Sequence, residues 1–219
     1  MPKAAEKSEL IIAGPAGALQ AMLETPEAAR SDALAIVCHP HPQHQGTMHN
    51  KVVHTLVRAF NELGLPALRF NFRGVGNSAG AYGGGAGETD DLLAVADYVR
   101  REWPEVSIWL AGFSFGAVVA ARASVRVGAV RLVCVAPAVN VLGENLHDRP
   151  TMPWLIVQGD EDEIVPIDEV RAWVAANQPG PELMELSGVG HFFHGALVEL
   201  RRLIVDKCGS GADNGAAGK

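Results

Sequence analysis

The segment that most constrains the fold of this chain runs from Val106 to Val125, with the sequence VSIWLAGFSFGAVVAARASV. It begins as an apolar run typical of a β-strand, narrows to Gly112-Phe113-Ser114-Phe115-Gly116, and continues in alanines that favour a helix. Glycines beside the serine are expected where a Cβ atom would collide with the adjoining strand or helix. The pattern predicts a sharp strand-to-helix turn that raises the Ser114 hydroxyl above the edge of a sheet.

A second copy of the same G-x-S-x-G pattern, residues 76–80, shows that the pentapeptide alone does not identify the nucleophile. This copy also follows an apolar run, but it leads into the glycine-rich residues 81–88, which are poor helix formers. Only Ser114 combines a strand before it with a helix after it. We therefore predict that Ser114 is a nucleophile and that Ser78 belongs to a flexible loop.

Strand-like and helix-like segments alternate along residues 1–207, which we interpret as one α/β domain. The alternation predicts a mostly parallel, doubly wound sheet of about eight strands, covered by helices on both faces. We expect a hairpin at the sheet edge over Ser8 to Leu23, a helix capped by Thr89, and a closing helix over Phe193–Lys207. Residues 208–219 contain no core-forming segment and are predicted to be a disordered tail.

The charge and hydropathy patterns exclude several classes of function. The net charge is −7 and the basic residues form no extended cluster, so nucleic acid is not an expected partner. No segment is long and apolar enough to predict a membrane span, and the first residues lack a signal-peptide layout. We therefore expect a cytoplasmic enzyme that acts on a small molecule.

A serine nucleophile requires a base and an orienting carboxylate. His191 follows the last predicted strand, and the acidic run 160–163 follows the strand before it, which gives the chain order serine, acid, histidine. Asp160 and Asp162 are alternative orienting acids at this point. For the oxyanion hole, Phe115 provides one backbone N–H, and His41 is the candidate for the second because Pro40 and Pro42 have none.

Two further stretches carry a resemblance to a known family. His39 to Val53 is similar to an HPHPxxxGTMxNKVV loop, and Phe70 to Gly80 to an FNFRGVGxSxG loop, both found in small bacterial members of the α/β-hydrolase superfamily. The resemblance implies an α/β-hydrolase fold and a serine esterase without cofactor or metal, related to dienelactone hydrolases and carboxylesterases. Its GxxDxxVP pattern points to Asp162 as the acid. Dienelactone hydrolases use a cysteine at the elbow, where this chain has Ser114.

The segment between the strand after the elbow helix and the next strand is too short for a helical lid domain. We therefore predict an open groove over Ser114, bordered by the loop that contains Tyr82 and by the loop that begins at His39. Both residues are expected to contact substrate. An open groove favours short-chain carboxylic esters as substrates, because longer acyl chains would project into water.

Other interpretations stay open. The HPHPQH sequence, with His39, His41 and His44, resembles the HxHxDH zinc motif of metallo-β-lactamase-type hydrolases, although Gln43 replaces its carboxylate. The run 74–79 fits a GxGxxA nucleotide-binding fingerprint but lacks the helix that should follow it. A hydrolase fold that only binds its ligand is the remaining alternative.

Overall fold

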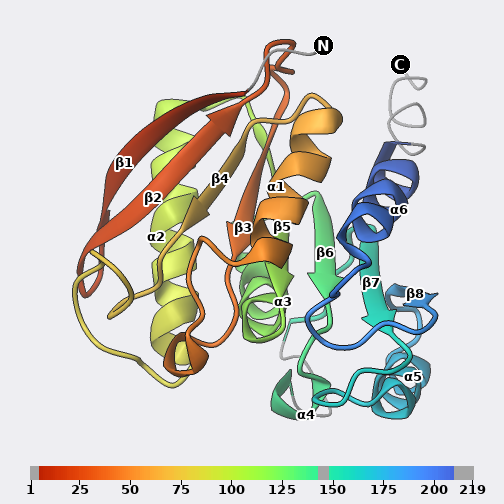
Figure 1. Cartoon of the computed structure of the whole chain (residues 1–219). Coiled ribbons are helices and arrows are strands. Elements are labelled where there is room, and N and C mark those ends of the chain that lie inside the picture. The colour runs from red at the N-terminus through yellow and green to blue at the C-terminus, as the bar shows by residue number, and fades with distance from the viewer. Residues whose placement is uncertain (1–4, 143–147, 210–219) are drawn as a thin grey trace.

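Eight strands form one sheet in the computed structural model, which describes residues 5–142 and 148–209 (Figure 1). The spatial order is β1-β2-β4-β3-β5-β6-β7-β8. β1 and β2 form the antiparallel edge, and every pair from β4 to β8 is parallel. The predicted mostly parallel sheet is therefore confirmed. The strands are β1 Glu6–Gly14, β2 Gly17–Thr25, β3 Ala33–Cys38, β4 Ala67–Phe70, β5 Ser107–Phe113, β6 Arg131–Val135, β7 Trp154–Gly159 and β8 Glu182–Leu186.

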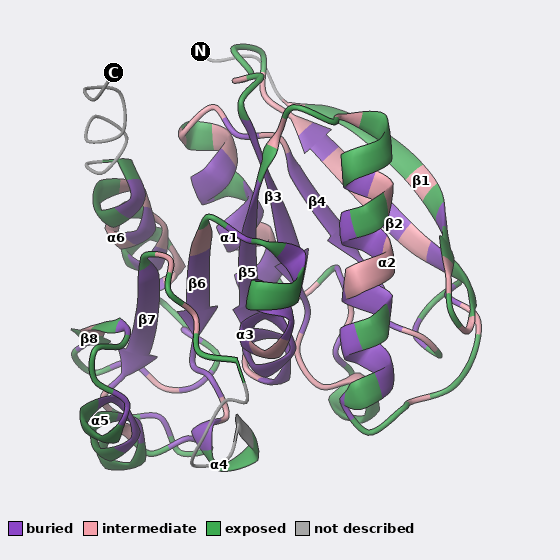
Figure 2. Ribbon diagram, turned by 180° about the vertical axis from the view of Figure 1, so that it is seen from behind, coloured by how far each residue is buried: buried purple, intermediate pink, exposed green. Residues whose placement is uncertain are grey.

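Helices cover both faces of this sheet. The helices α1 and α6 pack on one face, and α2, α3 and α5 pack on the other (Figures 1 and 2). A 3-10 turn and the short helix α4 lie in the connections. The helices are α1 Lys51–Glu62, α2 Ala86–Glu102, α3 Phe115–Val127, α4 Val139–Leu142, α5 Ile167–Ala176 and α6 Leu197–Gly209, and the 3-10 turn is Pro42–His44.

The strand β3 shows why the sequence requires two helical layers. Its six residues are all buried, and alternate side chains point to opposite faces. Leu34, Ile36 and Cys38 contact the core beneath α2 and α3. Ala33, Ala35 and Val37 contact the core beneath α1 and α6. A continuous apolar run of this kind is stable only in a strand that is covered on both sides.

Two helix boundaries differ from the predictions. The helix α2 begins at Ala86, not at a cap provided by Thr89, because the Glu88 carboxylate accepts hydrogen bonds from the N–H groups of Gly83 and Gly85 at 2.8 and 2.7 Å. Thr89 lies inside the helix, and its hydroxyl donates to the Gly85 carbonyl. Residues 86–88, the end of the glycine-rich run that was expected to be a poor helix former, are helical.

The helix α6 begins four residues later than predicted and extends further. Phe193, expected as its first residue, has a φ of 53° and is fully buried. At the other end α6 continues to Gly209, and Cys208 is buried, so the tail predicted to start at residue 208 is ordered over its first two residues. Residues 210–219 lie outside the described residues, and the single-domain assignment over 1–207 stays a prediction.

The parallel strands place several loops at one edge of the molecule. The carboxyl ends of β3, β5 and β7 point the same way, so the loops that follow them lie at that edge (Figure 1). Ligands bind at this edge in open α/β sheets. Among the described residues, no helix is long and apolar enough to cross a membrane.

Candidate active site

Ser114 stands on a strained turn between β5 and α3. Its φ of 54° and ψ of −117° are rare for a residue with a side chain. A Cβ on Gly112 would lie 2.3 Å from the Gly116 carbonyl, and one on Gly116 would lie 2.4 Å from the His39 carbonyl oxygen. Because backbone groups occupy both spaces, only glycine fits on either side of this turn. The turn has the geometry of a nucleophile elbow.

The Ser114 hydroxyl donates to a buried histidine. Ser114 Oγ lies 3.1 Å from His191 Nε2, and His191 Nδ1 lies 2.8 Å from Asp162 Oδ2. An ionised carboxylate only accepts hydrogen bonds, so Nδ1 carries the hydrogen and Nε2 presents its lone pair to the serine. Asp162 follows β7 and His191 follows β8, and both are buried. Such a chain of contacts can deprotonate a serine as it attacks a carbonyl carbon.

Asp162 is held as a carboxylate by several donors. Its Oδ1 accepts from the N–H groups of Ile164 and Val165 at 2.9 and 2.7 Å. Its Oδ2 accepts from Gln158 Nε2 at 2.8 Å, as well as from His191. Burial alone would raise the pKa of Asp162, but the hydrogen bonds from His191 and Val165 outweigh it, so the pKa lies below its usual value. The acid therefore stays ionised at neutral pH.

Gln158 is a member of this site that the sequence reasoning missed. It is the next-to-last residue of the buried strand β7 and is fully buried. The signal available in the sequence was a lone amide at the end of an apolar run, just before the acidic loop. That signal is weak, because a glutamine at a strand end is usually exposed.

The neighbouring acids have different partners. Asp160 is the alternative orienting acid, but its carboxylate accepts from the Gly188 N–H at 2.6 Å and from the Ser187 hydroxyl at 3.0 Å. The Gly188 N–H is the main cause of a lowered pKa at Asp160. Glu163 accepts from the backbone N–H of His191 at 3.3 Å. Of these acids, Asp162 is the one that contacts the imidazole ring.

Ser78, in the second G-x-S-x-G copy, is buried and already has partners. Its hydroxyl donates to the Asn71 carbonyl at 2.6 Å and accepts from the Gln20 N–H at 3.0 Å. These bonds fasten the loop after β4 to β2. Ser78 therefore links a loop to the sheet, and the partners in these two hydrogen bonds are backbone groups, not a histidine base.

His41, Phe115 and Tyr82 lie together beside the elbow. The His41 ring centroid lies 4.8 Å from that of Phe115 and 4.9 Å from that of Tyr82, whose hydroxyl is 3.1 Å from His41 Nε2. Among the described residues, neither the His41 nor the Phe115 backbone N–H donates to another group of the chain. The Phe115 N–H is in the first turn of α3, where intrahelical acceptors are lacking. These N–H groups stay the candidates for the oxyanion hole.

His39 is not placed to contact substrate, so that prediction is wrong. It is fully buried; its Nδ1 donates to the Pro40 carbonyl at 2.6 Å and its Nε2 accepts from the Phe72 N–H at 3.1 Å. Burial lowers its pKa to about 4, so the ring is neutral. Both ring nitrogens are occupied, so His39 cannot join a zinc site. Among the described residues, no group of three or more His, Cys, Asp or Glu side chains is arranged to hold a metal.

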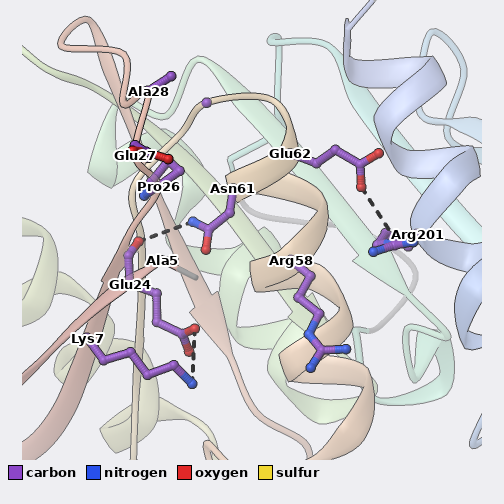
Figure 3. A pocket seen from close by; sticks show the side chains of 11 residues that line it. Ala5, Lys7, Glu24, Pro26, Glu27, Ala28, Arg58, Asn61, Glu62 and Arg201 are labelled. Atoms are coloured by element: carbon purple, nitrogen blue, oxygen red, sulfur yellow. Dashed lines mark hydrogen bonds and ion pairs between the residues drawn. The ribbon is translucent and has the colours of Figure 1, made fainter. Parts of the chain in front are cut away.

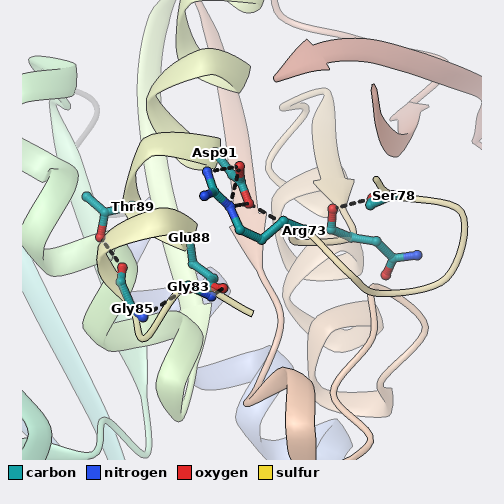
Figure 4. A network of polar contacts seen from close by, with 8 residues as sticks. Arg73, Ser78, Gly83, Gly85, Glu88, Thr89 and Asp91 are labelled. Carbon is teal, nitrogen blue, oxygen red and sulfur yellow. Dashed lines mark hydrogen bonds and ion pairs between the residues drawn. The ribbon is translucent and has the colours of Figure 1, made fainter. Parts of the chain in front are cut away.

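A network of buried carboxylates holds the glycine-rich loop beside the site (Figure 4). The Asp91 carboxylate accepts from the backbone N–H of Arg73 at 2.9 Å and from its guanidinium at 2.7 Å. Glu88 binds the backbone of Gly83 and Gly85, on the other side of Tyr82. The loop from residue 73 to residue 85 is therefore anchored near both ends, and Tyr82 is held against His41.

Comparisons with known proteins agree with the fold. Residues 29–148 match the family model described as serine aminopeptidase, S33. An α/β serine hydrolase homologue from Coxiella burnetii is 47% identical, with a TM-score of 0.87 over 91% of this chain and 96% of that chain. An α/β serine hydrolase without lid from Xanthomonas campestris is 41% identical, with a TM-score of 0.89 over 94% of each chain.

An uncharacterised protein from Rickettsia prowazekii (strain Madrid E) is 35% identical over 184 residues, which cover 79% of this chain and 77% of the relative. The chain belongs to the serine aminopeptidase S33 family of α/β hydrolases. The predicted α/β-hydrolase fold is thereby confirmed, and membership of this family supports a hydrolase activity. Residues 136–153, between β6 and β7, are too few for a lid domain, as in the Xanthomonas relative.

Proposed function

We propose that this chain is a serine carboxylesterase that cleaves short-chain carboxylic esters. The observation that carries the proposal is the continuous contact from Ser114 Oγ through His191 to Asp162, at 3.1 and 2.8 Å. A serine with a base in hydrogen-bonding distance, on an elbow of this strain, is equipped for acyl transfer.

In the proposed reaction, Ser114 Oγ attacks the ester carbonyl carbon while His191 Nε2 accepts its proton. The carbonyl oxygen becomes an oxyanion, which the N–H groups of Phe115 and His41 stabilise. His191 then gives the proton to the leaving alkoxide, which departs as an alcohol and leaves an acyl-enzyme. Water then attacks the acyl-enzyme carbonyl carbon with His191 again as the base, which releases the carboxylic acid and restores Ser114. Asp162 keeps the imidazole in the required tautomer throughout, and no cofactor or metal takes part.

The substrate class follows from how little covers the elbow. The short connection between β6 and β7 leaves Ser114 partly exposed, without a lid to enclose a long acyl chain. Tyr82, half-buried over Phe115, is proposed to contact the substrate on one side. An acyl chain that leaves this shallow surface gains none of the ~0.8 kcal/mol that each buried methylene contributes.

Labelling with a fluorophosphonate probe, followed by turnover of p-nitrophenyl acetate, tests the proposal. We expect the probe to react with Ser114, and Ser114→Ala to lower kcat/KM by several orders of magnitude. Ser78→Ala is the matched control: it should lower activity about tenfold at most, while destabilising the fold by about 1–3 kcal/mol because two buried partners lose their hydrogen bonds.

The same assays separate the other interpretations. A protein that only binds its ligand would leave the fluorophosphonate unreacted. A metallohydrolase would lose its activity on dialysis against a chelator and would keep it in Ser114→Ala. Faster cleavage of aminoacyl p-nitroanilides than of p-nitrophenyl esters would replace the esterase assignment with a peptidase, in line with the description of the family.

A further inference from the structure

A cavity between α1 and α6 has no part in the proposed reaction. Its volume is about 510 Å³, which is within the usual range for small-molecule sites. Residues of α1 four positions apart share one face of the helix, and this face forms one wall. The lining residues are Lys51, His54, Thr55 and Arg58 from α1, and Leu197, Val198 and Arg201 from α6.

Two of the three cations that line this cavity have no anionic partner in the part of the chain that the structure describes. Among the described residues, Lys51 and Arg58 have neither an ion pair nor a hydrogen bond from their side chains. Glu62, one turn beyond Arg58, pairs instead with Arg201, with 3.6 Å between Oε2 and Nε. Figure 3 shows the Arg58 guanidinium apart from the carboxylates of Glu62 and Glu24. No carboxylate of the described residues lines the cavity, although the chain carries a net charge of −7. A hollow lined by one sign of charge concentrates the opposite ion.

The adjoining hollow differs in its charges. A larger cavity of about 1070 Å³ shares Arg58 and Arg201 and extends along the end of β2 (Figure 3). Its lining includes the carboxylates Glu24, Glu27 and Glu62. Glu24 already pairs with Arg69 at 2.6 Å and with Lys7 at 3.4 Å. These carboxylates make the larger hollow less favourable for an anion than the cavity between α1 and α6.

His54 adds a neutral donor to the same wall. Arg69 Nη1 lies 3.0 Å from His54 Nε2, and because arginine only donates, Nε2 accepts and Nδ1 carries the hydrogen. Burial and the charge of Arg69 lower the pKa of His54 to about 4. The ring therefore keeps one N–H donor and no charge near neutral pH.

We propose that the cavity between α1 and α6 binds a small phosphate monoester with an apolar substituent. The oxygens of a phosphate point in several directions and carry close to two negative charges, which suits a cavity lined by two cations, Lys51 and Arg58, that are unpaired among the described residues. A carboxylate would be satisfied by a single guanidinium fork. Leu197 and Val198, of which Val198 is 55% exposed, provide the apolar surface next to the cations.

Isothermal titration calorimetry of the full chain with phenyl phosphate at low salt tests the proposal. We expect saturable one-to-one binding with a Kd of about 1 mM or tighter, weakened by added salt. Arg58→Gln should weaken binding about tenfold or more, since a charged hydrogen bond is lost. Lys51→Gln should also weaken it. Arg202→Gln, on α6 but outside the cavity lining, is the matched control and should bind as the wild type does.

The assay needs no turnover, so protein inactivated by a fluorophosphonate should give the same Kd, and the outcome is independent of the esterase proposal. Absence of saturable binding would overturn the inference, and so would an equal loss in Arg58→Gln and Arg202→Gln. Benzoate binding as tightly as phenyl phosphate would refute the phosphate assignment. Binding to phosphatidylglycerol vesicles without binding to phenyl phosphate would identify a lipid surface as the ligand and overturn the proposal of a soluble one.

Discussion

Gln158 offers the sharpest test of the arrangement around Asp162. Its amide nitrogen donates to Asp162 Oδ2 at 2.8 Å and to the Val165 carbonyl at 2.9 Å. Its carbonyl oxygen is buried and has no hydrogen-bond partner among the described residues. A buried acceptor without a partner costs ~1–3 kcal/mol. We infer that the two hydrogen bonds donated by the NH₂ group compensate this cost and hold the amide in its orientation.

Gln158→Leu removes the two donated hydrogen bonds and the orphaned carbonyl together. The bond to the carboxylate contributes ~1.5–3 kcal/mol and the bond to the carbonyl ~0.5–1.5 kcal/mol. Relief of the orphaned acceptor offsets ~1–3 kcal/mol, so the midpoints of these ranges leave a net destabilisation of about 1 kcal/mol. The loss in kcat/KM should be about tenfold to 150-fold, if the lost carboxylate bond acts fully in the transition state.

The pH dependence distinguishes positioning from packing. Because the pKa of Asp162 is lowered on folding, its stabilising effect is present above the unfolded value and is lost as the pH falls through the folded value. Gln158→Leu raises that folded pKa, so acid unfolding should start at a higher pH. In Gln158→Glu, the introduced carboxyl group faces Asp162, and its own pKa rises. When protonated, it donates to Asp162 as the amide does, so activity should fall as the pH rises through this new pKa.

The assay is kcat/KM for p-nitrophenyl acetate across the pH range, with circular dichroism to monitor folding. Gln178→Leu is the matched control, because the Gln178 amide donates to the Val174 carbonyl on α5 and not to Asp162. A Gln158→Leu protein with wild-type turnover would refute the reasoning. So would a Gln158→Glu profile that runs parallel to that of the wild type.

Asp162→Asn should keep the fold but lower turnover on the order of a thousandfold or more, whereas Asp160→Asn should be mild; the reverse result in steady-state kinetics would transfer the orienting role to Asp160. Gly116→Ala should lower the Tm by several degrees or prevent folding, because its Cβ would lie 2.4 and 2.5 Å from the carbonyl oxygens of His39 and Cys38; an unchanged melting curve would contradict the packing at the elbow. Among p-nitrophenyl esters, kcat/KM should peak between acetate and butyrate, without a jump on emulsified triglyceride; a peak at octanoate or longer would show an acyl pocket that the open site does not predict.

Local patterns determined most of the fold. The strand-to-helix turn at Ser114 could be predicted because its causes are neighbours in the chain: an apolar strand, two glycines and a run of alanines. The alternation of strands and helices predicted a parallel sheet, since each buried face needs a covering layer. The start of α2 was predicted less well. There a side chain inside the helix, Glu88, binds the backbone of the loop before it, and no local propensity reveals this contact.

The candidate site depended on tertiary structure where the sequence offered several similar groups. The sequence left Asp160 and Asp162 as alternative orienting acids, and the resemblance to the family pattern favoured Asp162. The structure separates them because the N–H groups of Ile164 and Val165 fix Asp162 beneath His191, while Asp160 turns to the loop after β8. The catalytic roles themselves stay predictions.

The sequence by itself determined that a serine would stand on an elbow, with an acid and a histidine following later strands. Strands and turns could be predicted because they depend mainly on residues that are neighbours in the chain. Whether a side chain is buried depends on residues distant in the chain, so the places of His39 and Gln158 were decided by the tertiary structure. His39, expected at the substrate, is enclosed by Phe72 and Pro40. Gln158, which drew no attention in the sequence, is buried because β7 lies between β6 and β8 in the sheet, and its amide there contacts Asp162.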